Sequence, residues 1–283
     1  MKVLVTGSEG FLGKHVVKVL KMAGHTVARL DVSPQAEIVA DITKIMPLMK
    51  VDAVIHLAAM ANPRDCDADP TRAFNTNVNG THQVLRLALE SGARKFVFSS
   101  SAHVYGISPK YLPTDERHPL WLQNTYTTTK ILGEQLCHLF YENHGLSYTN
   151  LRLFNAYGPG QAGGYFVPDM ILKARNGEVQ LKGGNTTKDF VFVDDVAHAF
   201  CLAVGSSYVG PLNIGTGLET PLDEVARWIA HKAGVKFYNW DQPDNTRMQA
   251  DSTRAKAVLG WEPRISLQKG LYATLRAAEK VAV

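Results

Sequence analysis

Short apolar runs alternate with longer amphipathic stretches through the first half of the chain. The short runs have the length and composition of strands buried on both faces, and they cover residues 2–6, 26–31, 53–57, 95–100 and 148–153. Helical periodicity lies between them, at residues 12–23, 70–90 and 125–143. Strands that alternate with helices imply right-handed crossovers and a parallel sheet covered on both faces. The pattern therefore predicts an α/β fold with a doubly wound sheet.

The second half of the chain has a looser pattern. After a glycine-rich stretch at residues 158–164, it predicts helices at 167–176 and 195–204 and short strands at 179–181, 190–193 and 212–215. Thr220-Pro221 predicts the start of a further helix, with threonine as the N-cap and proline in the first turn. We therefore expect a sheet domain at residues 1–157 and a smaller substrate-binding lobe at residues 158–283, from which residues 190–215 return to the main sheet.

The composition is that of an ordinary globular protein, with 45% hydrophobic and 20% charged residues in a chain of 283. The net charge of +4 includes no cluster of Lys and Arg, which argues against a nucleic-acid partner. The three cysteines are isolated, and no Cys or His pair has metal-ligand spacing, so we expect neither disulfides nor a metal site. The lack of a signal peptide and of a long apolar run predicts a cytoplasmic protein with no membrane partner.

A glycine turn, Gly7-x-x-Gly10-x-x-Gly13, connects the first predicted strand to the first predicted helix. Small residues at such a turn let the backbone approach a pyrophosphate, and the free N–H groups of the helix N-terminus favour an anion. The spacing differs from that of a P-loop, since His15 follows Lys14 where a magnesium-binding Ser or Thr would stand. These features indicate a Rossmann-type dinucleotide site, although glycines also mark structural turns.

A carboxylate at the end of the second predicted strand specifies the dinucleotide. Asp31 lies where an acid bonds both ribose hydroxyls, and its charge would repel a 2′-phosphate. We therefore expect NAD rather than NADP; the alternative is that Asp31 is a turn residue before Ser33-Pro34. Asp41 and Ile42 follow a further short strand and can either contact the adenine or cap the next helix.

Serine, tyrosine and lysine side chains supply the candidate chemistry. Ser99, Ser100 and Ser101 end a parallel strand at its carboxyl edge, where open α/β sheets bind ligands. Tyr126 and Lys130 share one helix face, so the ammonium is expected to favour the phenolate and lower the pKa of the tyrosine. A phenol that exchanges protons beside a nicotinamide is typical of an alcohol–ketone redox centre, whereas a serine run alone more often reflects turn chemistry.

The chain resembles the extended short-chain dehydrogenase/reductase family over nearly its whole length. Within that family it is most similar to the NAD-dependent epimerase/dehydratase group, and there to enzymes of the UDP-glucose (UDP-galactose) 4-epimerase type. The motifs that carry this resemblance are Thr6-Gly7-x-x-Gly10-Phe11-x-Gly13, His56-Leu57-Ala58-Ala59, Asn77-Val78-Asn79-Gly80-Thr81, the segment 99–106, Tyr126-x-x-x-Lys130, Arg152-Leu153-Phe154-Asn155, Phe192-Val193-x-Asp195-Val196 and Leu259-Gly260-Trp261-x-Pro263.

The resemblance implies a role for each residue that matches a family motif. The catalytic residues would be Ser101, Tyr126 and Lys130. The cofactor, NAD, would be bound by Gly7, Gly10, Phe11, Leu12, Gly13, Asp31, Asp41, Ile42, Leu57, Ala58, Ala59, Asn77, Ser99, Tyr126, Lys130 and Phe154. The substrate, a UDP-sugar, would be bound by Ser101, His103, Tyr126, Asn155, Lys188 and Arg247. Leu57 and Ala58 can instead simply complete a core strand.

Two positions after the catalytic serine bear on the type of reaction. The similar dehydratases carry an acidic pair there, because a carboxylic acid can protonate a leaving hydroxide. This chain has Ala102 and His103 instead, which disfavours a dehydratase. His103 can reach the substrate or serve in packing.

The C-terminal lobe departs from the pattern of the similar epimerases. Those enzymes grip the substrate diphosphate with two arginines, and Lys188 stands in the place of the first. Lysine keeps the charge but lacks the bidentate fork that suits phosphate. The segment 241–244 has no arginine in the place of the second, and Arg247 is the candidate substitute.

Two predicted helices, at residues 77–90 and 126–143, resemble those that form a four-helix bundle in homodimers of the family. Their apolar residues can build such a seam or pack on the sheet, and periodicity alone does not distinguish the two arrangements. The residues concerned are Val84, Leu85, Leu87, Ile131, Leu132, Leu136 and Leu139.

The sequence thus predicts an NAD-dependent nucleotide-sugar 4-epimerase that acts by hydride transfer through a transient 4-keto sugar. The alternative is an NAD-dependent dehydrogenase or reductase of a sugar or small hydroxy compound, because the diphosphate arginines are missing. A third reading is a nucleotide-sensing module without catalysis, and the intact Ser101, Tyr126 and Lys130 argue against it.

Overall fold

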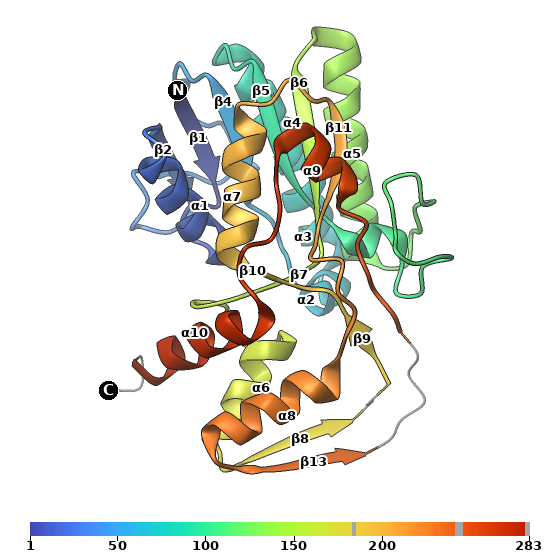
Figure 1. Cartoon of the computed structure of the whole chain (residues 1–283). Helices are drawn as coiled ribbons and strands as arrows, with labels where there is room; N and C mark the ends of the chain where they lie inside the picture. Colours follow the sequence, from blue (N-terminus) through green and yellow to red (C-terminus); the bar gives the residue numbers. More distant parts are fainter. Residues whose placement is uncertain (183–184, 241–245, 281–283) are drawn as a thin grey trace.

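A parallel sheet of seven strands forms the centre of the molecule, in the order β11–β6–β5–β4–β1–β2–β3 (Figure 1). The computed structural model describes residues 1–182, 185–240 and 246–280. The strands are β1 (Lys2–Thr6), β2 (Thr26–Asp31), β3 (Ile38–Val39), β4 (Ala53–His56), β5 (Lys95–Ser101), β6 (Ser147–Leu153) and β11 (Gly210–Ile214). This order, which runs outward in both directions from β1, confirms the predicted doubly wound sheet.

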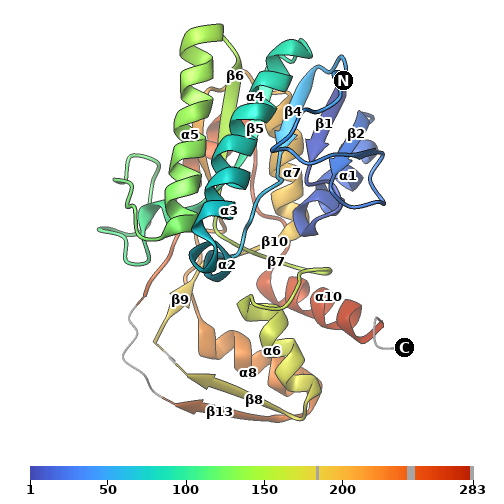
Figure 2. The same cartoon turned by 180° about the vertical axis from the view of Figure 1, so that it is seen from behind.

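Helices cover both faces of the sheet (Figures 1 and 2). One face carries α1 (Phe11–Met22), α7 (Val193–Val204) and α9 (Thr253–Leu259), and the other carries α4 (Gly80–Glu90) and α5 (Thr125–His144). The short helices α2 (Pro63–Ala68) and α3 (Pro70–Phe74) precede a π-helical turn, η1 (Asn75–Asn79), that continues into α4. The predicted helix at 70–90 is therefore one helical segment with a wide turn inside it. In the described parts of the chain, no helix combines the length and apolar character needed to cross a membrane.

A second group of elements lies beyond the carboxyl ends of the strands (Figure 1). Its helices are α6 (Phe166–Arg175), α8 (Leu222–Ala233) and α10 (Leu267–Lys280), and its small sheets pair β8 (Glu178–Lys182) with β13 (Lys236–Trp240), β7 (Asn155–Tyr157) with β10 (Phe190–Phe192), and β9 (Thr187–Lys188) with β12 (Thr220–Pro221). These elements enclose a separate hydrophobic core that includes Tyr157, Val179, Phe190 and Ile229.

The predicted cap of the helix after Thr220 is wrong by one residue. Thr220 and Pro221 pair with Lys188 and Thr187 in an antiparallel bridge, so both are held extended. The helix begins at Leu222, and its N-cap is Pro221, which has no hydroxyl to offer.

The C-terminal part of the chain returns to the main sheet. Trp261 is fully buried in the core beneath α7, and its Nε1 donates a hydrogen bond of 2.9 Å to the carbonyl oxygen of Asp195. The carboxylate of Asp195 in turn accepts from the backbone N–H of Ile265 at 3.0 Å. One face of the sheet is therefore covered by three stretches that are distant in sequence: α1, α7 and the segment from α9 to Trp261.

We expect Trp261→Ala to lower the free energy of unfolding by about 3–5 kcal/mol, because it removes a large buried side chain and its hydrogen bond. Trp240→Ala is the matched control, since Trp240 is 46% exposed, and should cost less than about 1 kcal/mol. Urea titration followed by circular dichroism measures both. Equal effects of the two substitutions would contradict the packing described for Trp261.

Candidate active site

The carboxyl end of β5 and the first two turns of α5 come together at one edge of the sheet. Asn124 caps α5 by accepting a hydrogen bond of 2.8 Å from the backbone N–H of Thr127. Further along, Gly133 faces the ring of Phe98 so closely that a Cβ atom would clash with it. The helix can therefore approach the strand, which places Tyr126 and Lys130 beside the serines that end β5.

Tyr126, Ser101 and His103 form one contiguous group. The phenol of Tyr126 is buried and hydrogen-bonded with Ser101. The ring of His103 meets that of Tyr126 edge-on, with 6.2 Å between the ring centroids. The backbone N–H of His103 donates to Ser101 Oγ at 3.2 Å, because Ser101 is the N-cap of the short helix η2 (Ala102–Tyr105). This local cap fixes the serine hydroxyl next to the phenol.

Lys130 is buried one turn along α5 from Tyr126. Its Nζ donates a hydrogen bond of 2.8 Å to the carbonyl oxygen of Ser99 and lies 5.8 Å from the centroid of the Tyr126 ring. Burial lowers the pKa of Lys130 to about 8, since the charged form loses its hydration.

The expected lowering of the Tyr126 pKa is wrong for this structure. Burial raises that pKa, and the hydrogen bond with Ser101 offsets only part of the rise. The ammonium of Lys130 is directed at the Ser99 carbonyl rather than at the phenol oxygen. The phenol of Tyr126 therefore keeps its proton at neutral pH.

His103 also has a strongly shifted pKa. Burial, followed by the positive charge of Lys188, lowers it to about 4, so the imidazole is neutral at ordinary pH. Lys188 belongs to the second lobe, and its Nζ contacts Met248 Sδ at 3.3 Å. Two of the residues expected to bind substrate, His103 and Lys188, are thus brought into the same neighbourhood as Tyr126.

A buried polar network underlies the serine strand. Ser100 Oγ donates to Glu134 Oε1 at 2.5 Å, and Arg152 holds the same carboxylate through Nε at 2.9 Å and Nη2 at 2.6 Å. Arg152 Nη1 also donates to the hydroxyl of Tyr105 at 2.9 Å. The sequence analysis did not single out Glu134, although its place one turn after Lys130 on the same helix face is a signal that could have found it.

The glycine turn has the shape that a dinucleotide requires. Gly7 has φ +70°, and a Cβ on it would lie 2.6 Å from the backbone nitrogen of Ala58. A Cβ on Gly13 would clash with the carbonyl oxygen of Gly7. The N-cap of α1 is Gly10, and the first turn consists of Phe11, Leu12 and Gly13, so its N–H groups are left for an outside anion.

Asp31 lies beside this turn. Its Oδ2 accepts from the backbone N–H of Glu9 at 2.9 Å, and its Oδ1 accepts from Ser33 at 3.0 Å. Each carboxylate oxygen keeps a second lone pair for a ribose hydroxyl. A carboxylate, a sharp glycine turn and an open helix N-terminus are the donor and acceptor set that NAD needs, so the residues fit the cofactor.

The other residues expected at the cofactor site have structural partners. Asn77 is buried; its Oδ1 accepts from Met60 N at 2.8 Å and its Nδ2 donates to Thr129 Oγ1 at 3.0 Å, which ties the loop after β4 to α5. Asp41 accepts from the backbone and the hydroxyl of Thr43 within a turn, which lowers its pKa. No helix begins between β3 and β4, a stretch that the structure describes in full, so the alternative of a helix cap is wrong, and the contact with adenine stays a prediction. Ile42, Ser99 and Phe154 are buried, and Leu57, Ala58 and Ala59 form the turn that follows β4.

The second lobe carries the residues expected to bind the rest of the substrate. Asn155 is anchored to Asp189 by a hydrogen bond of 3.2 Å from Nδ2 to the backbone oxygen. Arg247 forms a bidentate ion pair with Glu219, with both N–O distances at 2.6 Å. The segment 241–244, where the family has its second arginine, lies outside the described residues.

Four residues that the sequence did not indicate adjoin Tyr126. Cys66 and Ala73 pack with it in one buried cluster, with Met60 at the margin. Tyr165, the N-cap residue of α6, is near enough to raise the pKa of Tyr126 further. Nothing local in the sequence connects these segments with the tyrosine, because they meet only through tertiary packing.

Comparison with known proteins identifies the family. The sequence profile of the NAD-dependent epimerase/dehydratase family matches residues 3–215. The chain belongs to this family. That result confirms the resemblance drawn from the motifs of the sequence.

Individual members of the NAD-dependent epimerase/dehydratase family are similar over the full length. A UDP-glucose 4-epimerase of Mycolicibacterium smegmatis is 33% identical, with 97% of each chain covered. The structure of the Thermotoga maritima UDP-glucose 4-epimerase with UDP-glucose superposes with a TM-score of 0.89 at 30% identity, and covers all of both chains. The structure of MoeE5 in complex with UDP-glucose and NAD gives a TM-score of 0.92 at 28% identity, again over both whole chains.

The buried position of Lys130 predicts a pH dependence of stability. The unfolded lysine keeps its proton up to its ordinary pKa of 10.5, whereas the folded one releases it near 8. Between these values the unfolded state binds more protons, so this residue makes the folded state more stable as the pH rises. Relative to Lys130→Met, the wild type should gain about 2 kcal/mol of unfolding free energy between about pH 7 and about pH 9.5.

Urea titrations of both proteins at the two pH values test this prediction. Burial also lowers the pKa of Lys95 to about 8. The subtraction removes the contribution of Lys95 and of the buried tyrosines, because these groups are present in both proteins. A constant difference would mean that Lys130 has its ordinary pKa in the folded chain.

Proposed function

We propose that the protein is an NAD-dependent nucleotide-sugar epimerase that inverts C4 of a UDP-sugar of the UDP-glucose/UDP-galactose type. The observation that carries the proposal is the meeting of Ser101, Tyr126 and Lys130 at the end of β5. They lie in a chain whose full-length relatives include UDP-glucose 4-epimerases. Ala102, which cannot donate a proton, supports epimerisation over dehydration.

In this mechanism the chain's own residues move the proton and hold the sugar. Tyr126 accepts the proton of the C4 hydroxyl, and Ser101 holds the reacting oxygen through its own hydroxyl. The chemistry that NAD supplies when bound is reversible hydride transfer at C4, through a 4-keto sugar and without net oxidation. Because burial keeps the phenol protonated, the Ser101 hydrogen bond and the charge of Lys130 are the groups that have to favour the phenolate.

The proposed cofactor site consists of the glycine turn, Asp31 and the residues around the end of β4. Asp31 takes the adenosine ribose hydroxyls, and the N-terminus of α1 takes the pyrophosphate. Asp31 also makes NAD the preferred cofactor over NADP, because its charge repels a 2′-phosphate. Lys130 bonds the nicotinamide ribose from the opposite end of the site.

The proposed substrate site lies between His103 and Asn155 on one side and Lys188 on the other. Lys188 supplies the positive charge for the diphosphate, and Asn155 contacts a phosphate oxygen. Arg247 can join them only by exchanging its ion pair with Glu219 for one with the substrate. We further propose residues 1–157 as the NAD-binding domain and residues 158–283 as the substrate lobe, from which α7, β11 and α9 return to the main sheet. The proposed location is the cytoplasm, where the free thiols of Cys66, Cys137 and Cys201 stay reduced.

The purified protein should convert UDP-glucose into UDP-galactose without accumulating NADH, since hydride returns to the sugar in each cycle. Tyr126→Phe should lower kcat by about 100-fold or more, because it removes the proton acceptor, and should still bind NAD. Product analysis by chromatography and NADH absorbance measure the two outcomes.

The control for this experiment is Tyr141→Phe, a half-exposed tyrosine on the same helix, which should keep full activity. Stoichiometric NADH with an oxidised product would favour the alternative dehydrogenase. Full activity of Tyr126→Phe would refute the proposed proton acceptor.

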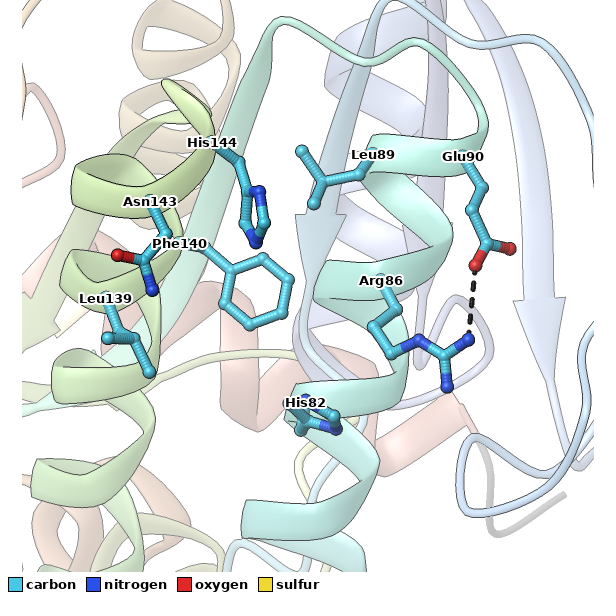
Figure 3. A pocket seen from close by; sticks show the side chains of 8 residues that line it. All are labelled: His82, Arg86, Leu89, Glu90, Leu139, Phe140, Asn143 and His144. Carbon is cyan, nitrogen blue, oxygen red and sulfur yellow. Dashed lines mark hydrogen bonds and ion pairs between the residues drawn. The ribbon is translucent and has the colours of Figure 1, made fainter.

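We also propose a homodimer in which α4 and α5 of two copies pack as a four-helix bundle. Of the two arrangements left open for Val84, Leu85 and Leu87, the structure shows packing in the core next to the sheet, so these side chains do not contribute to that seam. Leu132 and Leu139 remain 37% and 49% exposed. A groove of about 420 Å³ that includes Leu139 supports the proposal. Figure 3 shows its lining by His82, Arg86, Leu89 and Glu90 of α4 and Leu139, Phe140, Asn143 and His144 of α5.

Leu139→Glu should weaken the dimer by at least about tenfold, because it puts a charge into the proposed apolar seam. Leu172→Glu on α6 is the control, since Leu172 is exposed to a similar degree, and should leave the assembly unchanged. Light scattering after gel filtration measures both. A wild-type protein that is monomeric at all concentrations would exclude the bundle.

A further inference from the structure

The glycine turn carries an ion pair that the catalytic mechanism does not use. Glu9 stands between Gly7 and Gly10, and its Oε1 lies 2.8 Å from Nη1 of Arg29 on β2. The glutamate side chain is 12% exposed and the arginine side chain 31% exposed, so the pair is largely shielded from water. Ser8 Oγ approaches the same carboxylate oxygen at 3.4 Å.

This ion pair lies against Asp31, the residue proposed to hold the adenosine ribose. The backbone N–H of Glu9 donates to Asp31 Oδ2 at 2.9 Å, which makes the two acidic residues neighbours. Arg29 and Asp31 are two residues apart on β2, so their side chains leave the strand on the same face. One arginine and two carboxylates therefore share the end of the strand where the ribose binds.

The surroundings of Arg29 are basic. A hollow of about 440 Å³ next to the turn is lined by Lys14, Lys18 and Lys21 of α1 together with Arg29, and Glu9 is its acidic member. A group of cations with an arginine among them suits a phosphate dianion, because the guanidinium fork can bind two oxygens. The Glu9 carboxylate binds one arm of that fork, Nη1, and places a negative charge beside the guanidinium.

We propose that Glu9 is a second selectivity residue of the cofactor site, which occupies Arg29 and so excludes a 2′-phosphate on the ribose. The inference rests on the proposed NAD site and extends it, because Asp31 alone leaves Arg29 and the lysines to attract that phosphate. Asp31 and Glu9 exclude the 2′-phosphate in two different ways. Asp31 faces the ribose hydroxyls and repels the phosphate, whereas Glu9 binds the guanidinium of Arg29, which would otherwise pair with the phosphate.

The test measures the affinities of NAD and NADP for the full-length chain freed of bound nucleotide, by isothermal titration calorimetry. Glu9→Gln should raise the affinity for NADP by about tenfold, since it frees a guanidinium next to the site. The affinity for NAD should change by less than about threefold, because the backbone N–H of residue 9 still bonds Asp31.

Two further variants separate selectivity from a merely structural role. Glu9→Gln combined with Arg29→Met should lose the gain in NADP affinity, because no guanidinium is left to bind the phosphate. Glu279→Gln, which removes one member of an exposed Arg–Glu pair on α10, should leave both affinities unchanged.

The outcomes distinguish this proposal from the one on which it rests. An unchanged NADP affinity in Glu9→Gln, or a gain that persists without Arg29, would overturn the selectivity role. If Glu9→Gln bound neither NAD nor NADP, the selectivity role would also be overturned, and the ion pair of Glu9 and Arg29 would instead serve to hold the glycine turn in its conformation. If the wild type bound neither cofactor, the proposed NAD site itself would be wrong.

Discussion

The ion pair between Glu134 and Arg152 is the interaction on which the rest of the site depends. Both side chains are almost completely buried, at 4% and 5% exposure, so neither charge is tolerable without the other. The pair joins α5 to β6, and Glu134 also holds Ser100 of β5. Ser100 adjoins Ser101, and Glu134 follows Lys130 by one helical turn. The spacing between Ser101, Tyr126 and Lys130 is therefore set by an ion pair that has no role in the proposed reaction.

The same network extends to β11, the edge strand of the main sheet. Tyr105, bonded to Arg152, donates to Asn213 Oδ1 at 2.6 Å, and Asn213 Nδ2 reaches the backbone of Thr114 and Asp251. A second buried acid, Asp189, accepts from the N–H groups of Thr216, Gly217 and Ala250 and so fixes the strand next to Lys188. Buried polar side chains that bond to backbone groups thus fix the segment after β5 and the segment around Lys188 relative to each other, on the two sides of the proposed substrate site.

The sequence predicts the features that local chemistry decides. The turn from Gly7 to Gly13 and the placement of Ser101, Tyr126 and Lys130 depend on spacing within one strand, turn or helix, and the structure reproduces that spacing. The pKa of Tyr126 depends on how tightly Cys66 and Ala73 cover it, and these residues are distant in sequence. For the same reason periodicity could not tell that Val84 and Leu85 face the sheet while Leu139 faces outward. The ion pair of Glu9 and Arg29 links a turn to a neighbouring strand, a contact that only the fold creates.

The return of Trp261 to the sheet bears on how the protein is made. During synthesis the first six strands of the sheet emerge early, but the edge strand β11 and the indole that fills the core under α7 come much later. Until the chain up to Trp261 has left the ribosome, apolar side chains of β1, β6 and α7 lack their final cover. The nascent protein therefore keeps one face of its main sheet partly uncovered until a tryptophan that follows the last strand of that sheet, β11, has been translated.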